Sequence, residues 1–161
     1  MIRRLLVAAS LLPWGVGWAQ QADTTKPASA AQEPTWSMPP RSLDLYVGLR
    51  SNGGTHFMMG AKYGRRLPSS RNMGIAGFGE VAFASQTEFL VGALFQIMPV
   101  NRLLLETGPG GEFDGGSNFF WRVSGEYELQ ARKLFIIPKF YLDFVNGTTV
   151  VGYGVAIGRG R

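Results

Sequence analysis

Acidic side chains and large apolar side chains lie on opposite faces of an alternating pattern that runs from Arg41 to Arg161. Only Glu112 and Asp114 depart from this rule, and both lie in a Gly-rich segment that we expect to be a loop. A period of two repeated over many short segments predicts β-strands with one apolar and one charged face. A β-barrel inserted in lipid requires this division. The carboxylates that share the charged face are Asp44, Glu80, Glu88, Glu106, Glu126, Glu128 and Asp143.

The alternation divides into eight strands separated by turn-forming segments rich in Gly, Asn and Pro. The expected strands cover residues 42–50, 56–63, 72–83, 87–98, 101–108, 118–129, 134–144 and 148–158. Such lengths suit strands that cross a bilayer at a tilt of about 45°. Because the number is even, the first and last strands can pair and leave no open edge in lipid. The predicted fold is all-β: an eight-stranded antiparallel up-and-down transmembrane β-barrel with a lumen filled by side chains.

One hairpin can be placed in register from the sequence alone. If Arg132-Lys133 is a two-residue turn, Glu126 lies opposite Lys139, and Arg122 lies opposite Asp143. Both pairs have the inward parity, and an unpaired charge in a lumen with little water is costly. We therefore expect an ion-pair network inside the barrel. Its expected members are Arg122, Asp143, Glu126, Lys139, Glu106, Glu80, Glu88 and Arg102.

Aromatic side chains of the outward parity gather near the ends of the expected strands. Phe83, Phe89, Phe119 and Trp121 would lie near one rim of the barrel, and Tyr63 and Tyr127 near the other. Aromatic girdles at the two interfaces of a bilayer have this distribution. A soluble β-sandwich also alternates and remains an alternative, but it would carry charged residues, lysines above all, over both outer sheets.

The first 41 residues differ in composition from the rest. Residues 1–19 have the features of a secretory signal peptide: Arg3 and Arg4, an apolar stretch from Leu5 to Trp18, and small residues before Gln20. Residues 20–41 are rich in Gln, Ala, Thr, Ser and Pro and are expected to form a flexible periplasmic linker. The barrel domain would then cover residues 42–161.

These features together resemble the small eight-stranded outer-membrane β-barrels of the OmpA/OmpX type, a porin-like class of Gram-negative bacteria. The resemblance covers residues 42–159 and rests on the export signal, strand count, parity and inward charge pairs. It implies location in the cell outer membrane and a periplasmic N-terminus. Turns at 65–71, 99–101 and 130–133 would face the periplasm, and loops at 51–55, 84–87, 108–118 and 145–148 would face outward. Such barrels usually end on an aromatic residue, whereas this chain ends in Ile157-Gly158-Arg159-Gly160-Arg161.

The resemblance also implies partners. These are outer-membrane lipids, lipopolysaccharide and, during insertion, the barrel-assembly machinery. A formal charge of +5 without a basic cluster argues against a nucleic-acid partner.

Little in the chain points to catalysis or to a cofactor. His56 is the single histidine, and Met58 stands where outer-membrane lipid A deacylases carry the serine of their motif. Ser124 and Glu88 could approach His56, but nothing in the sequence places them there. The Gly108–Asn118 segment offers carboxylates for Ca²⁺ without the spacing of an EF-hand. We therefore predict no catalytic residue, no cofactor and no metal site, and with no cysteine there is no disulfide or thiolate ligand.

The function predicted from these observations is that of a small non-enzymatic barrel with a structural or surface-interaction role in the cell envelope. One alternative is a barrel enzyme that uses His56 to modify lipid A or phospholipid. A second alternative is a soluble periplasmic barrel that binds an apolar ligand.

Overall fold

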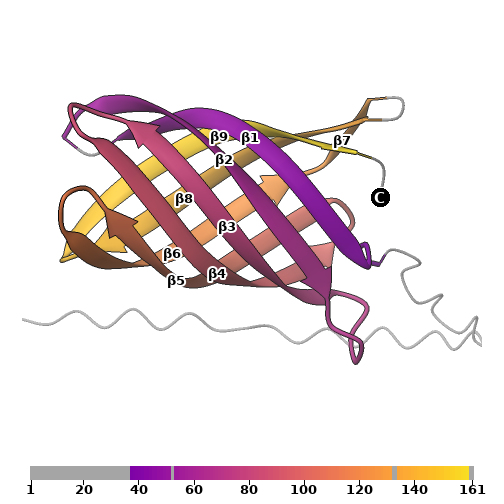
Figure 1. Cartoon of the computed structure of the whole chain (residues 1–161). Coiled ribbons are helices and arrows are strands. Elements are labelled where there is room, and N and C mark those ends of the chain that lie inside the picture. Colours follow the sequence, from indigo (N-terminus) through magenta and orange to yellow (C-terminus); the bar gives the residue numbers. More distant parts are fainter. Residues whose placement is uncertain (1–36, 52, 132–133, 160–161) are drawn as a thin grey trace, which may run out of the picture. The chain divides into compact units, whose positions relative to one another are not determined.

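The computed structural model describes residues 37–51, 53–131 and 134–159 as one closed antiparallel sheet. Its strands are β1 (Arg41–Ser51), β2 (Thr55–Arg66), β3 (Met73–Phe83), β4 (Thr87–Val100), β5 (Leu103–Phe113), β6 (Ser117–Tyr127), β7 (Leu129–Ala131), β8 (Leu134–Val145) and β9 (Thr148–Arg159). Apart from β6 and β7, strands that follow one another along the chain pair with one another, as Figure 1 shows. No helix among these residues is long and apolar enough to cross a membrane.

Two pairings complete the closed sheet: one joins its first and last strands, and the other joins β6 to β8 past the short β7. β1 pairs with β9, and β6 pairs with β8 as well as with β5. β7 continues β6 after an interruption at Glu128, whose N–H donates to the carbonyl of Arg102 at 2.8 Å. Because β6 and β7 form one interrupted strand, the predicted eight-stranded up-and-down barrel is confirmed.

Every strand runs between the same two ends of the barrel. The termini end is where β1 begins and β9 ends, and its connections among the described residues are 67–72 and 101–102. The loop end carries the connections 52–54, 84–86, 114–116 and 146–147. The loop-end connections are two or three residues long, so the barrel has little structure beyond its rim on that side.

The long loop predicted at 108–118 is wrong, because β5 continues through Gly108 and Pro109 to Phe113. Glycine and proline are poor strand formers, which is why the sequence pattern indicated a loop. The β4–β5 ladder has its gap here: pairing stops at Gly92↔Gly110 and resumes at Phe95↔Thr107. Proline has no N–H to donate, and pairing with β6 continues at Pro109↔Trp121.

The predicted signal peptide, residues 1–19, and the predicted linker up to residue 36 lie outside the described residues. The last residues of that linker segment contact the barrel. The N–H of Met38 donates to the carbonyl of Arg71 at 2.8 Å, and the Met38 carbonyl accepts from Arg66 Nη1 at 3.0 Å. The Met38 side chain is buried against Met98 and Leu104 and covers the termini end of the lumen from within.

The lumen is packed by aromatic rings that lie over glycines of the neighbouring strand. Tyr141 is the register partner of Gly152, and Phe120 is the partner of Gly110. A Cβ atom on Gly152 would lie 1.9 Å from Tyr141 Cζ, and one on Gly110 would lie 2.2 Å from Phe120 Cζ. Both rings are fully buried, so they have no free space to move into. These glycines are therefore required by packing.

We expect Gly152→Ala to lower the free energy of unfolding by about 1–3 kcal/mol, because its methyl group must displace the Tyr141 ring in a filled lumen. Gly125→Ala is the matched control, since a Cβ there meets its nearest atom, Leu105 Cδ2, at 3.8 Å. The control should stay within about 0.5 kcal/mol of the wild type. Urea unfolding of the barrel in lipid vesicles, followed by tryptophan fluorescence, measures both. Equal stability of the two variants would contradict the packing argument.

Candidate functional site

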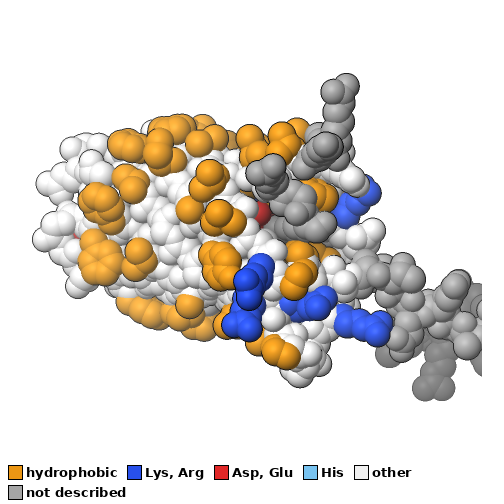
Figure 2. Space-filling model, turned by 45° about the vertical axis from the view of Figure 1, so that its right-hand side comes forward, with side chains coloured by type: hydrophobic (Ala, Val, Ile, Leu, Met, Phe, Trp, Pro, Cys, Tyr) orange, Lys and Arg blue, Asp and Glu red, His pale blue; other side chains and the backbone are white. Residues whose placement is uncertain are grey.

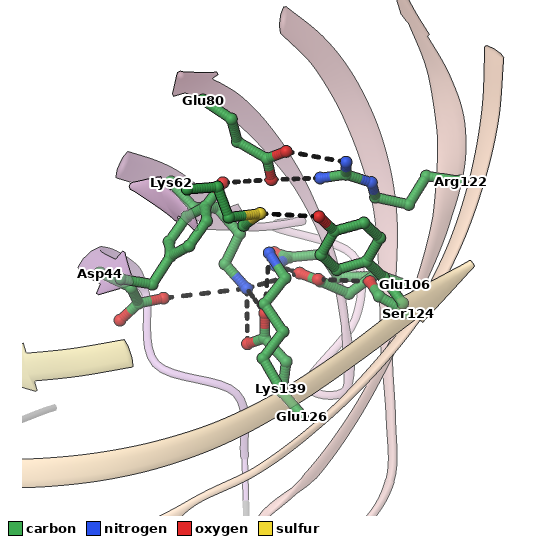
Figure 3. A network of polar contacts seen from close by, with 12 residues as sticks. Asp44, Lys62, Glu80, Glu106, Arg122, Ser124, Glu126 and Lys139 are labelled. Carbon is green, nitrogen blue, oxygen red and sulfur yellow. Dashed lines mark hydrogen bonds and ion pairs between the residues drawn. The ribbon is translucent and has the colours of Figure 1, made fainter. Parts of the chain in front are cut away.

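Arg122 on β6 binds two carboxylates that come from different walls of the barrel. Its Nε and Nη2 donate to the two oxygens of Asp143 on β8 at 2.6 and 2.8 Å. Its Nη2 also donates to Glu80 Oε2 on β3 at 2.8 Å, and Nη1 donates to Glu80 Oε1. Figure 3 shows Arg122 and Glu80 facing each other across the lumen. The guanidinium also lies over the rings of Phe78 and Tyr141, with its Cζ 4.4 and 4.0 Å from their centroids.

Lys62 on β2 organises a second group of charges, also seen in Figure 3. Its Nζ lies 2.8 Å from Glu106 Oε1 and 2.6 Å from Glu126 Oε2. Asp44 Oδ2 is farther away, at 3.9 Å. Ser124 Oγ donates to the other oxygen of Glu106 at 2.9 Å. Glu106 therefore has partners on both of its oxygens, as a buried carboxylate requires.

Arg50 on β1 binds a third group of acids near the loop end. Its Nη1 donates to Glu88 and its Nη2 donates to Glu112. Its Nε lies 3.9 Å from Asp143 Oδ2. Because Asp143 also binds Arg122, the Arg50 group and the Arg122 group form one continuous network through the lumen.

The predicted register of the β6–β8 hairpin is confirmed, with Arg122 opposite Asp143 and Glu126 opposite Lys139. The two pairs differ in their contacts. Arg122 and Asp143 are joined by two hydrogen bonds, whereas Lys139 Nζ lies 3.6 Å from Glu126 Oε1 and makes no hydrogen bond within the described residues. Lys139 Nζ lies instead 4.2 Å from the centroid of the Tyr46 ring. The shorter ion pair of Glu126 is with Lys62.

The placement of Arg102 in the lumen network is wrong. Arg102 is exposed in the β4–β5 turn and has a φ of 70°, so its side chain does not follow the parity of the strand. The exclusion of Glu112 from the charged face is also wrong, because Glu112 is 2% exposed and faces the lumen from the extended β5. Glu112 has the same parity as Glu106 on the same strand, and this shared parity was the signal in the sequence that could have placed it in the lumen.

Acids outnumber bases in the lumen. The buried charged side chains of the described residues are the bases Arg50, Lys62, Arg122 and Lys139 and the acids Asp44, Glu80, Glu88, Glu106, Glu112, Glu126, Glu128 and Asp143. The three bases with the shortest contacts, Arg50, Lys62 and Arg122, are each shared by at least two acids. Removal of one of these bases would therefore leave two or more buried carboxylates without their main partner.

The six aromatic residues predicted for the membrane interfaces are all exposed on the outer wall. Between 44 and 64% of each of these residues is exposed. Rings that face the lumen, such as Phe120 and Tyr141, are fully buried instead. Phe83, Phe89 and Phe119 lie close to the loop end of their strands, and Trp121 lies on the same half of β6. Tyr63 and Tyr127 lie toward the termini end. Phe57 stacks on Phe83 with ring centroids 5.9 Å apart and extends the group at the loop end.

His56 has no catalytic arrangement around it in the described structure. Its register partner is Arg50, near the loop end of β2. Ser124 lies near the termini end of β6, and its hydroxyl donates to Glu106. Glu88 does lie within electrostatic reach of His56, but its carboxylate is bound by Arg50. No group of three or more His, Cys, Asp or Glu side chains suited to a metal ion is present in the described ranges.

Comparison with known proteins shows similarity in fold. No known protein family and no curated protein matches the sequence. A de novo designed transmembrane β-barrel is 14% identical over 76% of this chain and 98% of its own, with a TM-score of 0.54. Ail, the attachment invasion locus protein of Yersinia pestis, is 11% identical over 74% of this chain and 96% of its own, with a TM-score of 0.49. A structure of Ail with the heparin analogue sucrose octasulfate gives 0.48. The match to the designed barrel supports the closed-barrel fold and no particular activity.

We expect Arg122→Met to lower the free energy of unfolding by about 3–5 kcal/mol, because it leaves Glu80 and Asp143 buried without their main partner. Arg102→Met is the matched control, since it removes an exposed base from the same barrel and should cost less than about 0.5 kcal/mol. Combining Arg122→Met with Glu80→Gln and Asp143→Asn should recover much of the loss. Urea unfolding in lipid vesicles measures all three. An Arg122→Met barrel as stable as the wild type would refute the network's role.

Proposed function

We propose that this protein is a small non-enzymatic β-barrel of the bacterial outer membrane, with a structural or surface-contact role in the cell envelope. The observation that carries the proposal is the reversed polarity of the barrel: charged side chains fill the inside, and apolar side chains cover the outside. Outer-membrane lipids and lipopolysaccharide would be its immediate surroundings. Export through the segment 1–19 and insertion by the barrel-assembly machinery belong to the same proposal.

The outer wall carries a continuous set of exposed apolar side chains. Leu43, Leu45 and Val47 alternate along β1, and Phe89, Val91 and Phe95 along β4, each more than two-fifths exposed. Figure 2 shows apolar side chains distributed along the length of the visible face of the wall. A soluble monomer rarely exposes so large an apolar surface, whereas lipid tails solvate it well. This arrangement disfavours the soluble barrel for apolar ligands, which would have the opposite polarity.

The connections favour a structural role over adhesion. Those at the loop end, including 84–86 and 114–116, have two or three residues each and offer little surface above the membrane. Side chains that contact one another fill the lumen. The proposed role therefore does not include transport through a wide pore. We place the termini end in the periplasm, in agreement with a chain that is exported and has its linker on that side.

Fractionation of native cells tests the proposal directly. We expect the protein in the outer-membrane fraction after a carbonate wash, with faster gel migration when the sample is left unheated, because a closed barrel resists unfolding by detergent. Gly125→Ala is a folded control for migration. Recovery of the protein in the soluble periplasmic fraction would contradict the membrane assignment.

The alternative of a lipid-modifying enzyme is tested by His56→Ala. The Ser124 hydroxyl donates to Glu106, and Glu88, the acid that could orient His56, is bound to Arg50. We therefore expect that this substitution leaves the lipid A and phospholipid composition unchanged. Mass spectrometry of lipids from cells with the wild type, with His56→Ala and without the protein provides the measurement. A lipid species that disappears in both altered strains would favour the enzyme.

A further inference from the structure

We propose that the outer wall of the barrel holds one anionic glycerophospholipid, with its acyl chain in a groove between β2 and β6 and its phosphate on Arg65. This proposal rests on the membrane location argued above and adds a specific lipid partner to it. It combines two observations that are independent of each other: a one-sided distribution of exposed charge, and a hollow in the apolar wall that ends at a base.

Exposed bases occur at one end of the barrel only. Among the residues whose side chains the structure describes, the bases outside the lumen are Arg41, Arg65, Arg66, Arg71 and Arg102, which we call the basic rim; Arg66 is half-buried and the others are exposed. All of them lie at the termini end, while the connections of the loop end contain no Lys or Arg. Figure 2 shows basic side chains gathered at one end and none on the visible surface of the other.

The basic rim has no acidic counterpart on the outer surface. Every described acid is buried in the lumen except Asp114, which lies at the loop end. Arg41 and Arg65 are register partners on β1 and β2, and neither makes an ion pair with another described residue. Two bases at paired backbone positions, without an ion pair to another described residue, attract the phosphate of a lipid headgroup, since each base near an anionic membrane surface adds to binding.

A groove of about 630 Å³, lined at its rim end by Arg65, runs into the apolar wall. Its lining includes Gly77, which has no side chain, and Ala93, which has a small one, together with Tyr63, Phe95, Thr107 and Trp121. Arg65 lies next to the end of β2, whereas Thr107 and Trp121 lie well inside β5 and β6. The groove therefore leads from the rim toward the middle of the barrel, the direction that an acyl chain takes from its headgroup.

Two polar side chains along the groove, Thr107 and Trp121, are hydrogen-bonded within the wall. Trp121 Nε1 donates to Thr107 Oγ1 at 2.8 Å, and Thr107 Oγ1 donates to the carbonyl of Arg122 at 3.1 Å. The groove thus offers an apolar channel with a single free charged group, Arg65, at its rim end. An occupant with a long hydrocarbon chain and an anionic head fits both features. With the termini end in the periplasm, the leaflet at this rim is the one built of phospholipid.

Quenching of Trp121 by brominated lipid tests the proposal. The probe is the full chain with Trp14, Trp18 and Trp36 replaced by Phe, so that Trp121 is the only tryptophan. Vesicles keep one ratio of phosphatidylglycerol to phosphatidylcholine, and only the lipid that carries the brominated acyl chains is changed. We expect brominated phosphatidylglycerol to bind beside Trp121 about fivefold better than brominated phosphatidylcholine.

Two variants and a second reporter make the result specific. Arg65→Gln should abolish the preference, whereas Arg102→Gln, which removes the same charge from the rim but does not line the groove, should keep it. A tryptophan introduced by Phe140→Trp on β8, in the Trp121→Phe background, should report equal quenching by both lipids. Heat-dependent gel migration of each variant establishes that it is folded and tests the membrane assignment separately.

Three outcomes would overturn the proposal. These are equal quenching of Trp121 by both lipids in the folded wild type, an equal loss of preference in Arg65→Gln and Arg102→Gln, and relief of the quenching by added lipid A, which would assign the groove to a different lipid. Migration as a folded membrane barrel together with any of them would leave the proposed function intact and remove only the lipid site.

Discussion

The structure depends on pairing, inside a closed sheet, charged side chains that would be costly to bury alone. Arg122, Lys62 and Arg50 each bind carboxylates from two or more strands, so the contacts cross the lumen as well as following the sheet. A buried ion pair adds little net stability compared with apolar packing, because desolvation offsets its attraction. Its main consequence here is specificity. A slip of one residue in any strand would move that strand's charges into contact with lipid and its large apolar side chains into the lumen.

The apolar surface of the outer wall and the charged interior of the lumen both result from the same alternation of side chains along each strand. Along β6, Phe119, Trp121 and Val123 are exposed, while Phe120 and Arg122 between them are fully buried. Closure through β1–β9 and β6–β8 leaves no sheet edge along the wall. Glycines such as Gly110 and Gly152 give the rings of neighbouring strands room inside. The barrel is therefore filled by matched ring–glycine pairs and ion pairs, and apolar side chains cover its outer wall.

The sequence was sufficient to predict the fold, because parity and turn composition are local properties. It was also sufficient for contacts between neighbouring strands, such as Arg122 with Asp143. It was not sufficient for contacts across the lumen. Glu80 on β3 reaches Arg122 on β6 because the strands tilt and curve, and the sequence alone does not specify that geometry. For the same reason the main partner of Glu126 is Lys62, and not Lys139 as the register of neighbouring strands suggested.

The remaining errors have local causes. The run from Gly108 to Gly111 has low strand propensity, yet its neighbours hold it in the sheet, which moved Glu112 from a predicted loop into the lumen. Arg102 had the inward parity, but a positive φ in a two-residue turn removed it from the strand pattern. Parity is informative only where the strand is continuous.

The claim that lipid contacts the apolar side of every strand is tested most directly by a nitroxide scan of β4 in a bilayer. Labels would be placed singly at positions 89 to 95 of the folded barrel. The account predicts accessibility with a period of two. Oxygen should reach labels at the outward positions Phe89, Val91, Ala93 and Phe95, whereas a water-soluble nickel reagent should not. Labels at the positions between them should be shielded from both reagents. Outward labels that the nickel reagent reaches freely, or accessibility without alternation, would contradict it.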